Sequence, residues 1–226
     1  MDRSTEFTFG VPWIMSFFHQ DWTLSASTAA AAVADQFVEE LEPEAVLLVR
    51  RDARLLLEGL PPDRITELWQ QGVEGGERFY HRGRARDGAE WMRQVLGVCD
   101  AWLSRRSDSP ALSGADRFEG RDLADQVLSV VEEFRAVLGE GVTDALAECV
   151  RHCSPDLAFR LLLQVLPPKS ASLSPEYLYL SAEQYARLEA LGAAFRYGEY
   201  VVSDVKYLVG PYAGNRFATR RPAPPW

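Results

Sequence analysis

Six consecutive residues near the N-terminus combine aromatic rings with groups that exchange protons or hydrogen bonds: Phe17, Phe18, His19, Gln20, Asp21 and Trp22. A histidine oriented by a carboxylate acts as a general base when a nucleophile or substrate lies within hydrogen-bond reach. The sequence identifies neither for His19, and side chains two positions apart on a helix do not face each other. We therefore interpret the hexapeptide as a structural motif. Its rings each bury about 150–250 Å², and its polar members hydrogen-bond to nearby backbone groups.

Two cysteines and a histidine recur at helical spacing in the second half of the chain: Cys149, His152 and Cys153. Thiolate and imidazole groups suit zinc, but a structural zinc site needs four ligands and no second cluster completes this one. Helical neighbours four residues apart hold their Cβ atoms about 5–6 Å apart, wider than the roughly 3.5–4.5 Å of a disulfide. We therefore expect packed, reduced cysteines and no metal. The odd total of three cysteines also argues against a disulfide framework.

A basic run interrupts the helical pattern in the middle of the first half: His81, Arg82, Arg84 and Arg86. Guanidinium forks bind phosphate, but nearby carboxylates offset this charge, so we expect a solvated loop. The net charge of −9 also argues against a nucleic-acid partner, because sequence-independent binding depends on neutralising phosphates. Phosphate-binding glycine motifs, GxSxG and HExxH are absent, so we expect no cofactor and no enzymatic activity.

The densest group of carboxylates surrounds Pro43: Asp35, Glu39, Glu40, Glu42 and Glu44. Such a group is commonly the solvated end of a helix. Its alternative role is a docking face, because concentrated negative charge attracts a basic partner over distance. We treat these five residues as candidate partner-facing residues.

The bulk composition indicates a globular protein. The chain has 226 residues, of which 47% are hydrophobic, and this suits one large domain or two small ones. No uninterrupted apolar run is long enough to cross a bilayer, so no membrane partner is expected. The N-terminus lacks the apolar core of a signal peptide, and we expect a location in the reduced cytoplasm.

Helical periodicity dominates the first hundred residues. We predict four helices: Thr28–Leu41, Glu44–Glu58 with Pro43 at its start, a short helix capped by Asp63 and ended by Gly72, and Ala89–Arg106. Between the last two, Phe79 and Tyr80 form a short strand or plug the bundle. Four helices are enough for an up-and-down bundle. Residues 1–106 are therefore predicted to form a helical domain that carries the hexapeptide.

Residues 107–120 are small and polar and include proline and glycine, which predicts a linker. The second block, residues 121–226, is predicted to contain several helices and one strand. Its elements are Asp122–Leu138, Val142–Cys153, a helix capped by Ser154 and ended by Pro167 and Pro168, a strand at Tyr177–Leu180, and a helix from a Ser181/Gln184 capping box to Leu191, closed by Gly192. Residues 195–209 form either a hairpin or a last helix. The predicted class is mainly α, an N-terminal helical bundle followed by a second helical block with a small C-terminal β element (α+β).

The FHQDW motif, followed by helices, a glycine-rich break and a late tryptophan-bearing helix, resembles one family. These are the helical immunity proteins of contact-dependent growth inhibition and related polymorphic toxin systems. The resemblance covers roughly residues 7 to 105.

The resemblance implies a cytoplasmic protein that binds and neutralises a cognate protein toxin by stoichiometric inhibition, without turnover or cofactor. It does not imply which residues contact the toxin. Whether the protein forms a homo-oligomer is also left open. Two alternatives also stay open. One is a small metal-independent enzyme with a site between the two blocks, using His19, Asp21 or His81, and the other is a helical adaptor.

Overall fold

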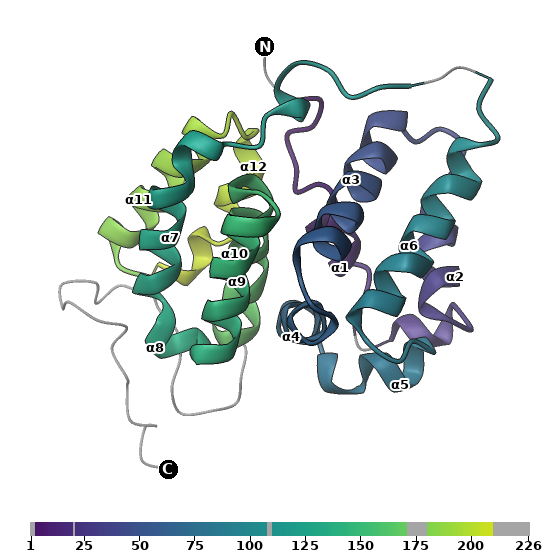
Figure 1. Cartoon of the computed structure of the whole chain (residues 1–226), viewed down its shortest axis with the longest axis horizontal. Coiled ribbons are helices and arrows are strands. Elements are labelled where there is room, and N and C mark those ends of the chain that lie inside the picture. The colour runs from purple at the N-terminus through teal and green to yellow at the C-terminus, as the bar shows by residue number, and fades with distance from the viewer. Residues whose placement is uncertain (1–2, 20, 108–109, 171–179, 210–226) are drawn as a thin grey trace.

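The computed structural model describes residues 3–19, 21–107, 110–170 and 180–209 of the chain (Figure 1). These residues are mainly helical, which confirms the predicted class in its coarse form. The helices before residue 107 are α1 (Val11–Met15), η1 (Trp22–Leu24), α2 (Ala29–Gln36), α3 (Pro43–Gly59), α4 (Pro62–Gly72), η2 (Gly76–Arg78), α5 (Phe79–Gly83) and α6 (Gly88–Leu103). Those after it are η3 (Gly114–Arg117), η4 (Arg121–Leu123), α7 (Ala124–Glu133), α8 (Arg135–Leu138), α9 (Glu140–His152), α10 (Pro155–Ser170), α11 (Ala182–Ala194), α12 (Glu199–Ser203) and η5 (Lys206–Leu208). None of the described helices is long and apolar enough to span a bilayer.

Several helices begin where local chemistry predicts. Pro43 opens α3 at its first position, where the missing N–H costs nothing. The Ser154 hydroxyl accepts from the Leu157 N–H at 3.1 Å and so caps α10. At α11, Ser181 and Gln184 form the predicted capping box, each side chain accepting from the other residue's backbone N–H.

The predicted start at Asp63 is wrong, because α4 begins one residue earlier, at Pro62, with Pro61 as its cap. The predicted helix Thr28–Leu41 ends early, at Gln36. The side chains of Trp102 and Arg106 satisfy backbone carbonyls beyond this point, so these groups need no helical hydrogen bonds.

Three further boundaries differ from the predictions. The predicted helix Asp122–Leu138 is broken at Phe134, whose backbone leaves the helical region while its ring is buried. The helix α10 continues past Pro167 to Ser170, since the fixed φ of proline is itself helical. The helix α11 continues past Gly192, where a Cβ would lie 2.4 Å from Val202 Cγ2. This glycine therefore permits close packing and does not end the helix.

The predicted C-terminal β element is not confirmed. Within the described residues there is no β-strand, only an isolated parallel bridge between Leu180 and Val209. Residues 177–179 of the predicted strand lie outside the described residues. For residues 195–209, where either a hairpin or a last helix was predicted, the structure has two short helices, α12 and η5. Phe79 and Tyr80, for which a strand or a plug was expected, open α5, and the Phe79 ring is buried.

Two groups of helices lie side by side, α1–α6 on the right and α7–α12 on the left of Figure 1. Within the first group α3 packs along α6, and within the second α9 packs on α7 and α10. The helix α4 joins them, because it contacts α6 on one side and α9 and α10 on the other. The buried hydrophobic residues form one cluster that contains side chains of both groups. Residues 107–120 connect the groups, and their role as a boundary between folding units stays a prediction.

Candidate functional site

The structure divides the FFHQDW hexapeptide between the core and the surface. Phe18 and Trp22 are buried, and the Phe18 ring lies 5.0–5.7 Å from four other rings, those of Trp22, Trp69, Phe79 and Trp91. Phe17 is half-buried against Trp13, at 5.0 Å between ring centroids. Edge-to-face contacts of this kind stabilise a core beyond the area that they bury. Gln20 lies outside the described residues.

The two polar members of the hexapeptide that the structure describes, His19 and Asp21, are exposed. His19 Nδ1 accepts a hydrogen bond from the backbone N–H of Asp21 at 3.4 Å, and the Asp21 carboxylate makes no bond to the imidazole. The imidazole lines a pocket of about 340 Å³ with Trp22, Phe79 and Arg82. No hydrogen bond joins His19 or Asp21 to His81. A base oriented by a carboxylate is therefore not assembled from these three residues.

The five candidate carboxylates lie on the surface, where α2 ends and α3 begins. Asp35, Glu39, Glu40 and Glu42 are exposed, and Glu44, in the first turn of α3, is half-buried. None of the five carboxylates forms an ion pair or a side-chain hydrogen bond with a described residue. We call residues 38–44, which carry the four glutamates, the acidic segment. Its charges are available to a partner.

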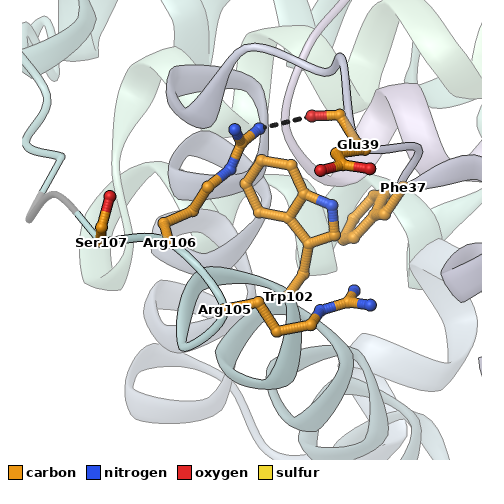
Figure 2. A pocket seen from close by; sticks show the side chains of 6 residues that line it. All are labelled: Phe37, Glu39, Trp102, Arg105, Arg106 and Ser107. Carbon is orange, nitrogen blue, oxygen red and sulfur yellow. Dashed lines mark hydrogen bonds between the residues drawn. The ribbon is translucent and has the colours of Figure 1, made fainter.

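Two side chains, Trp102 in the last turn of α6 and Arg106 three residues past its end, hold the backbone of the acidic segment (Figure 2). The Trp102 indole N–H donates to the carbonyl of Val38 at 3.2 Å. Arg106 Nη2 donates to the carbonyls of Glu39 and Leu41, at 2.8 and 2.7 Å. The Arg106 guanidinium also lies over the Trp102 ring, 4.2 Å from its centroid, a cation–π contact. Three backbone carbonyls thus depend on two side chains.

A pocket of about 440 Å³ opens beside this contact. Its lining combines two aromatic rings with two guanidinium groups, one carboxylate and a hydroxyl: Phe37, Glu39, Trp102, Arg105, Arg106 and Ser107. A second hollow, of about 360 Å³, shares three of these residues and continues between α2 and α6 along small side chains such as Ala34 and Ala101. The Arg105 side chain is exposed and forms no hydrogen bond or ion pair with the described residues. Aromatic and arginine groups are the side chains that most often dominate binding energy at protein interfaces.

A buried ion pair lies where the two groups of helices meet. Asp52 of α3 accepts two hydrogen bonds from Arg160 of α10, at 2.7 and 3.1 Å, and neither side chain is exposed. Asp52 Oδ2 also accepts from the Val11 N–H at 3.0 Å, and Arg160 donates to the Phe9 carbonyl at 2.8 Å. Gly10 has a φ of 68°, and a Cβ there would lie 1.8 Å from Asp52 Oδ2. Only glycine lets the N-terminal segment close over the ion pair.

Asp156 extends this pair into a network. Its carboxylate accepts from Arg3 at 2.6 Å, Arg160 at 2.9 Å, the Tyr197 hydroxyl at 3.0 Å and Arg51 at 3.2 Å. Burial alone would raise the pKa of Asp156, but the three arginines outweigh burial and hold this pKa below its usual 3.8. Burial raises the pKa of Tyr197 well above its usual value, and the Asp156 charge adds to this shift. The phenol therefore stays neutral.

Asp52, Asp156, Arg3 and Arg160 are closed to solvent, while the Arg51 side chain is 16% exposed. All four carboxylate oxygens already have donors, so neither carboxylate is open to a substrate. Removing one member of a buried ion pair is strongly destabilising, and this makes the network a structural connection between the two groups. Sequence reasoning missed it. The available signals were a charged residue on the apolar helix α3 and an Asp156/Arg160 pair four residues apart on the apolar helix α10.

The remaining candidate clusters do not converge. Cys149 and Cys153 are buried free thiols, Cys153 Sγ donates to the Leu55 carbonyl at 3.1 Å, and His152 is exposed. In the part of the chain that the structure describes, no group of three or more His, Cys, Asp or Glu side chains is placed to hold a metal ion.

The basic run lies on α5 and the turn after it, and all of its side chains are exposed: His81, Arg82, Arg84 and Arg86. Arg86 forms an ion pair with Glu90 at 2.7 Å, while the other three side chains bond to no described residue. The run is thus solvated as predicted, with part of its charge offset by a neighbour, but the predicted loop is wrong for His81 and Arg82, which lie in α5.

The chain matches no protein family model, no curated protein and no solved structure.

Proposed function

We propose that this protein is a cytoplasmic immunity protein that binds a basic toxic domain one to one and inhibits it by covering its active surface. The observation that carries this proposal is the acidic segment, whose four glutamates form no ion pairs with described residues while its backbone is held by Trp102 and Arg106. Charges that are exposed, unpaired and fixed in place suit recognition of an oppositely charged surface. The FHQDW motif, through its resemblance to toxin-neutralising immunity proteins, points to the same class of partner.

Two kinds of group at the acidic segment and its adjoining pocket contribute to binding in different ways. Its glutamates steer the encounter, because electrostatic complementarity acts mainly on the association rate. The adjoining pocket, which Phe37 and Trp102 line, supplies the aromatic groups that anchor a bound partner. Inhibition of this kind is stoichiometric and needs no cofactor.

The direct test is co-expression in a sensitive host with the toxic domain that the neighbouring gene encodes. Cells should survive only when this protein is present, and the purified pair should form a one-to-one complex. Reversing Glu39, Glu40, Glu42 and Glu44 to lysine should lower the association rate by about tenfold or more at low salt. Association of the wild type should also slow with added salt, since the screening length is about 8 Å at 0.15 M.

A matched control reverses four exposed carboxylates of the second block that likewise form no ion pair with any residue the structure describes: Asp122, Asp125, Glu140 and Glu199. This variant has the same net charge as the first but keeps the acidic segment, so its association rate should fall much less. Equal loss in both variants would show that only total charge matters. If the neighbouring domain is harmless, or kills equally with and without this protein, the proposed function is wrong.

A further inference from the structure

We propose that Arg106 is a positioning residue that orders the acidic segment for its partner before the partner arrives. This inference rests on the proposed function and adds to it a residue that contributes through geometry and not through its charge. Arg106 carries a positive charge beside a surface that selects a basic partner. If charge alone mattered, the arginine would weaken binding.

The hydrogen bonds of Arg106 explain its presence. A single nitrogen, Nη2, donates to the carbonyls of Glu39 and Leu41, two residues apart in the acidic segment. The Trp102 ring supports the guanidinium from one face at 4.2 Å and fixes its position. Within the segment, one backbone hydrogen bond joins Leu41 N–H to the Val38 carbonyl, at 3.3 Å. Trp102 and Arg106 therefore donate three of the four hydrogen bonds that hold the backbone of residues 38–41.

An ordered segment binds more tightly than a mobile one, because the apparent affinity falls in proportion to the population of the binding-competent conformation. If the loss of Arg106 reduces the ordered population to about a tenth, the dissociation constant rises about tenfold. The neighbouring residue provides a matched comparison. Arg105 carries the same charge one position earlier but bonds to nothing in the segment.

The first measurement uses the free protein. Amide hydrogen exchange of residues 37–45 should be faster in Arg106→Ala than in wild type, and unchanged in Arg105→Ala. Arg106→Lys should restore much of the protection, because one ammonium nitrogen replaces the single nitrogen that donates to both carbonyls. Melting temperatures of all three variants show whether the fold is intact. Unchanged exchange in Arg106→Ala, or equal effects of both alanine variants, would overturn the proposal.

The second measurement uses an inactivated form of the toxic domain encoded by the neighbouring gene, immobilised as the binding probe. Arg106→Ala should bind about tenfold more weakly, although it removes a repulsive charge, whereas Arg105→Ala should bind as tightly as wild type or more tightly. Stronger binding by Arg106→Ala would overturn the positioning role. Failure of the wild type to bind this probe would instead overturn the proposed function, and with it a role of Arg106 in recognition. The exchange experiment still decides separately whether Arg106 orders the segment.

Discussion

Asp52 of α3 and Arg160 of α10 lie 108 residues apart in the sequence and are joined by two hydrogen bonds in the interior of the protein. Neither side chain has any exposure to solvent. This relationship connects the part of the chain that carries the FFHQDW hexapeptide to the second block. The first two predictions concern the network around it.

Arg160→Met should lower the free energy of unfolding by about 3–5 kcal/mol, because it leaves Asp52 and Asp156 buried without their shared counter-charge. Urea unfolding at neutral pH measures the loss. The control is Arg187→Met, which removes the ion pairs of Arg187 with Glu133 and Glu183 on the surface and should change stability little. Equal stability of the two variants would contradict a structural role for the network.

Stability should fall in acid through Asp156. Its pKa is lowered in the folded protein, so the carboxylate stabilises the fold fully above the unfolded pKa of about 4 and loses this effect as the pH falls through the lower folded pKa. Unfolding free energies measured between about pH 5 and about pH 2 should show this decline. Asp156→Asn should be less stable at neutral pH and show a shallower decline, whereas the exposed Asp125→Asn should follow wild type. A slope identical in all three proteins would exclude this assignment.

Trp22→Ala should cost about 3–5 kcal/mol of stability, because it removes a buried ring from a packed aromatic cluster. The Trp22 ring lies 5.3 Å from that of Phe18 and 6.2 Å from that of Phe79. Thermal melting compares it with Leu24→Ala, two residues later, whose side chain is 86% exposed and whose loss should be nearly neutral. An unchanged melting temperature with lost toxin neutralisation would show that Trp22 is a binding residue instead.

Limited proteolysis should cut first between Ser107 and Ser113, inside the predicted linker. The later part of the linker is protected, because Ala115 and Asp116 are buried and the Asp116 carbonyl accepts from Arg51 at 2.6 Å. The two fragments should co-elute on size exclusion after the cut, since α4 packs against α9 and α10. Separation into two folded fragments would instead show that the blocks are independent units, and a first cut elsewhere would contradict the boundary.

Local chemistry in the sequence predicted where three helices start: α3, α10 and α11. Pro43, Ser154 and the Ser181/Gln184 box act within their own turns, so their effect is readable from neighbouring residues. The end of α2 could not be predicted from neighbouring residues. The carbonyls after Gln36 are satisfied by Trp102 and other side chains more than sixty residues away.

The geometry of the candidate site also depends on contacts between residues that are far apart in the sequence. The acidic residues are evident in the sequence, but their lack of ion pairs and the arginine that holds their backbone depend on how α6 meets the end of α2. The buried network was missed for a related reason. A single aspartate such as Asp52 on an apolar helix has no visible partner until α10 is placed against α3. Distant pairing of charged side chains leaves no periodic pattern in the sequence.

The central ion pair also sets an order of events during synthesis. Ribosomes add about 5–20 residues per second, so Asp52, which precedes Arg160 by 108 residues, is translated roughly 5–20 s before its partner. Throughout that interval the nascent chain contains the Asp52 carboxylate with the neighbouring Arg51 but without Arg160. Arg3 cannot form its ion pair with Asp156 until that residue has also been translated. The buried network therefore takes its final form only after residue 160 has left the ribosome, which makes closure of the N-terminal segment over Asp52 a late step of biosynthesis.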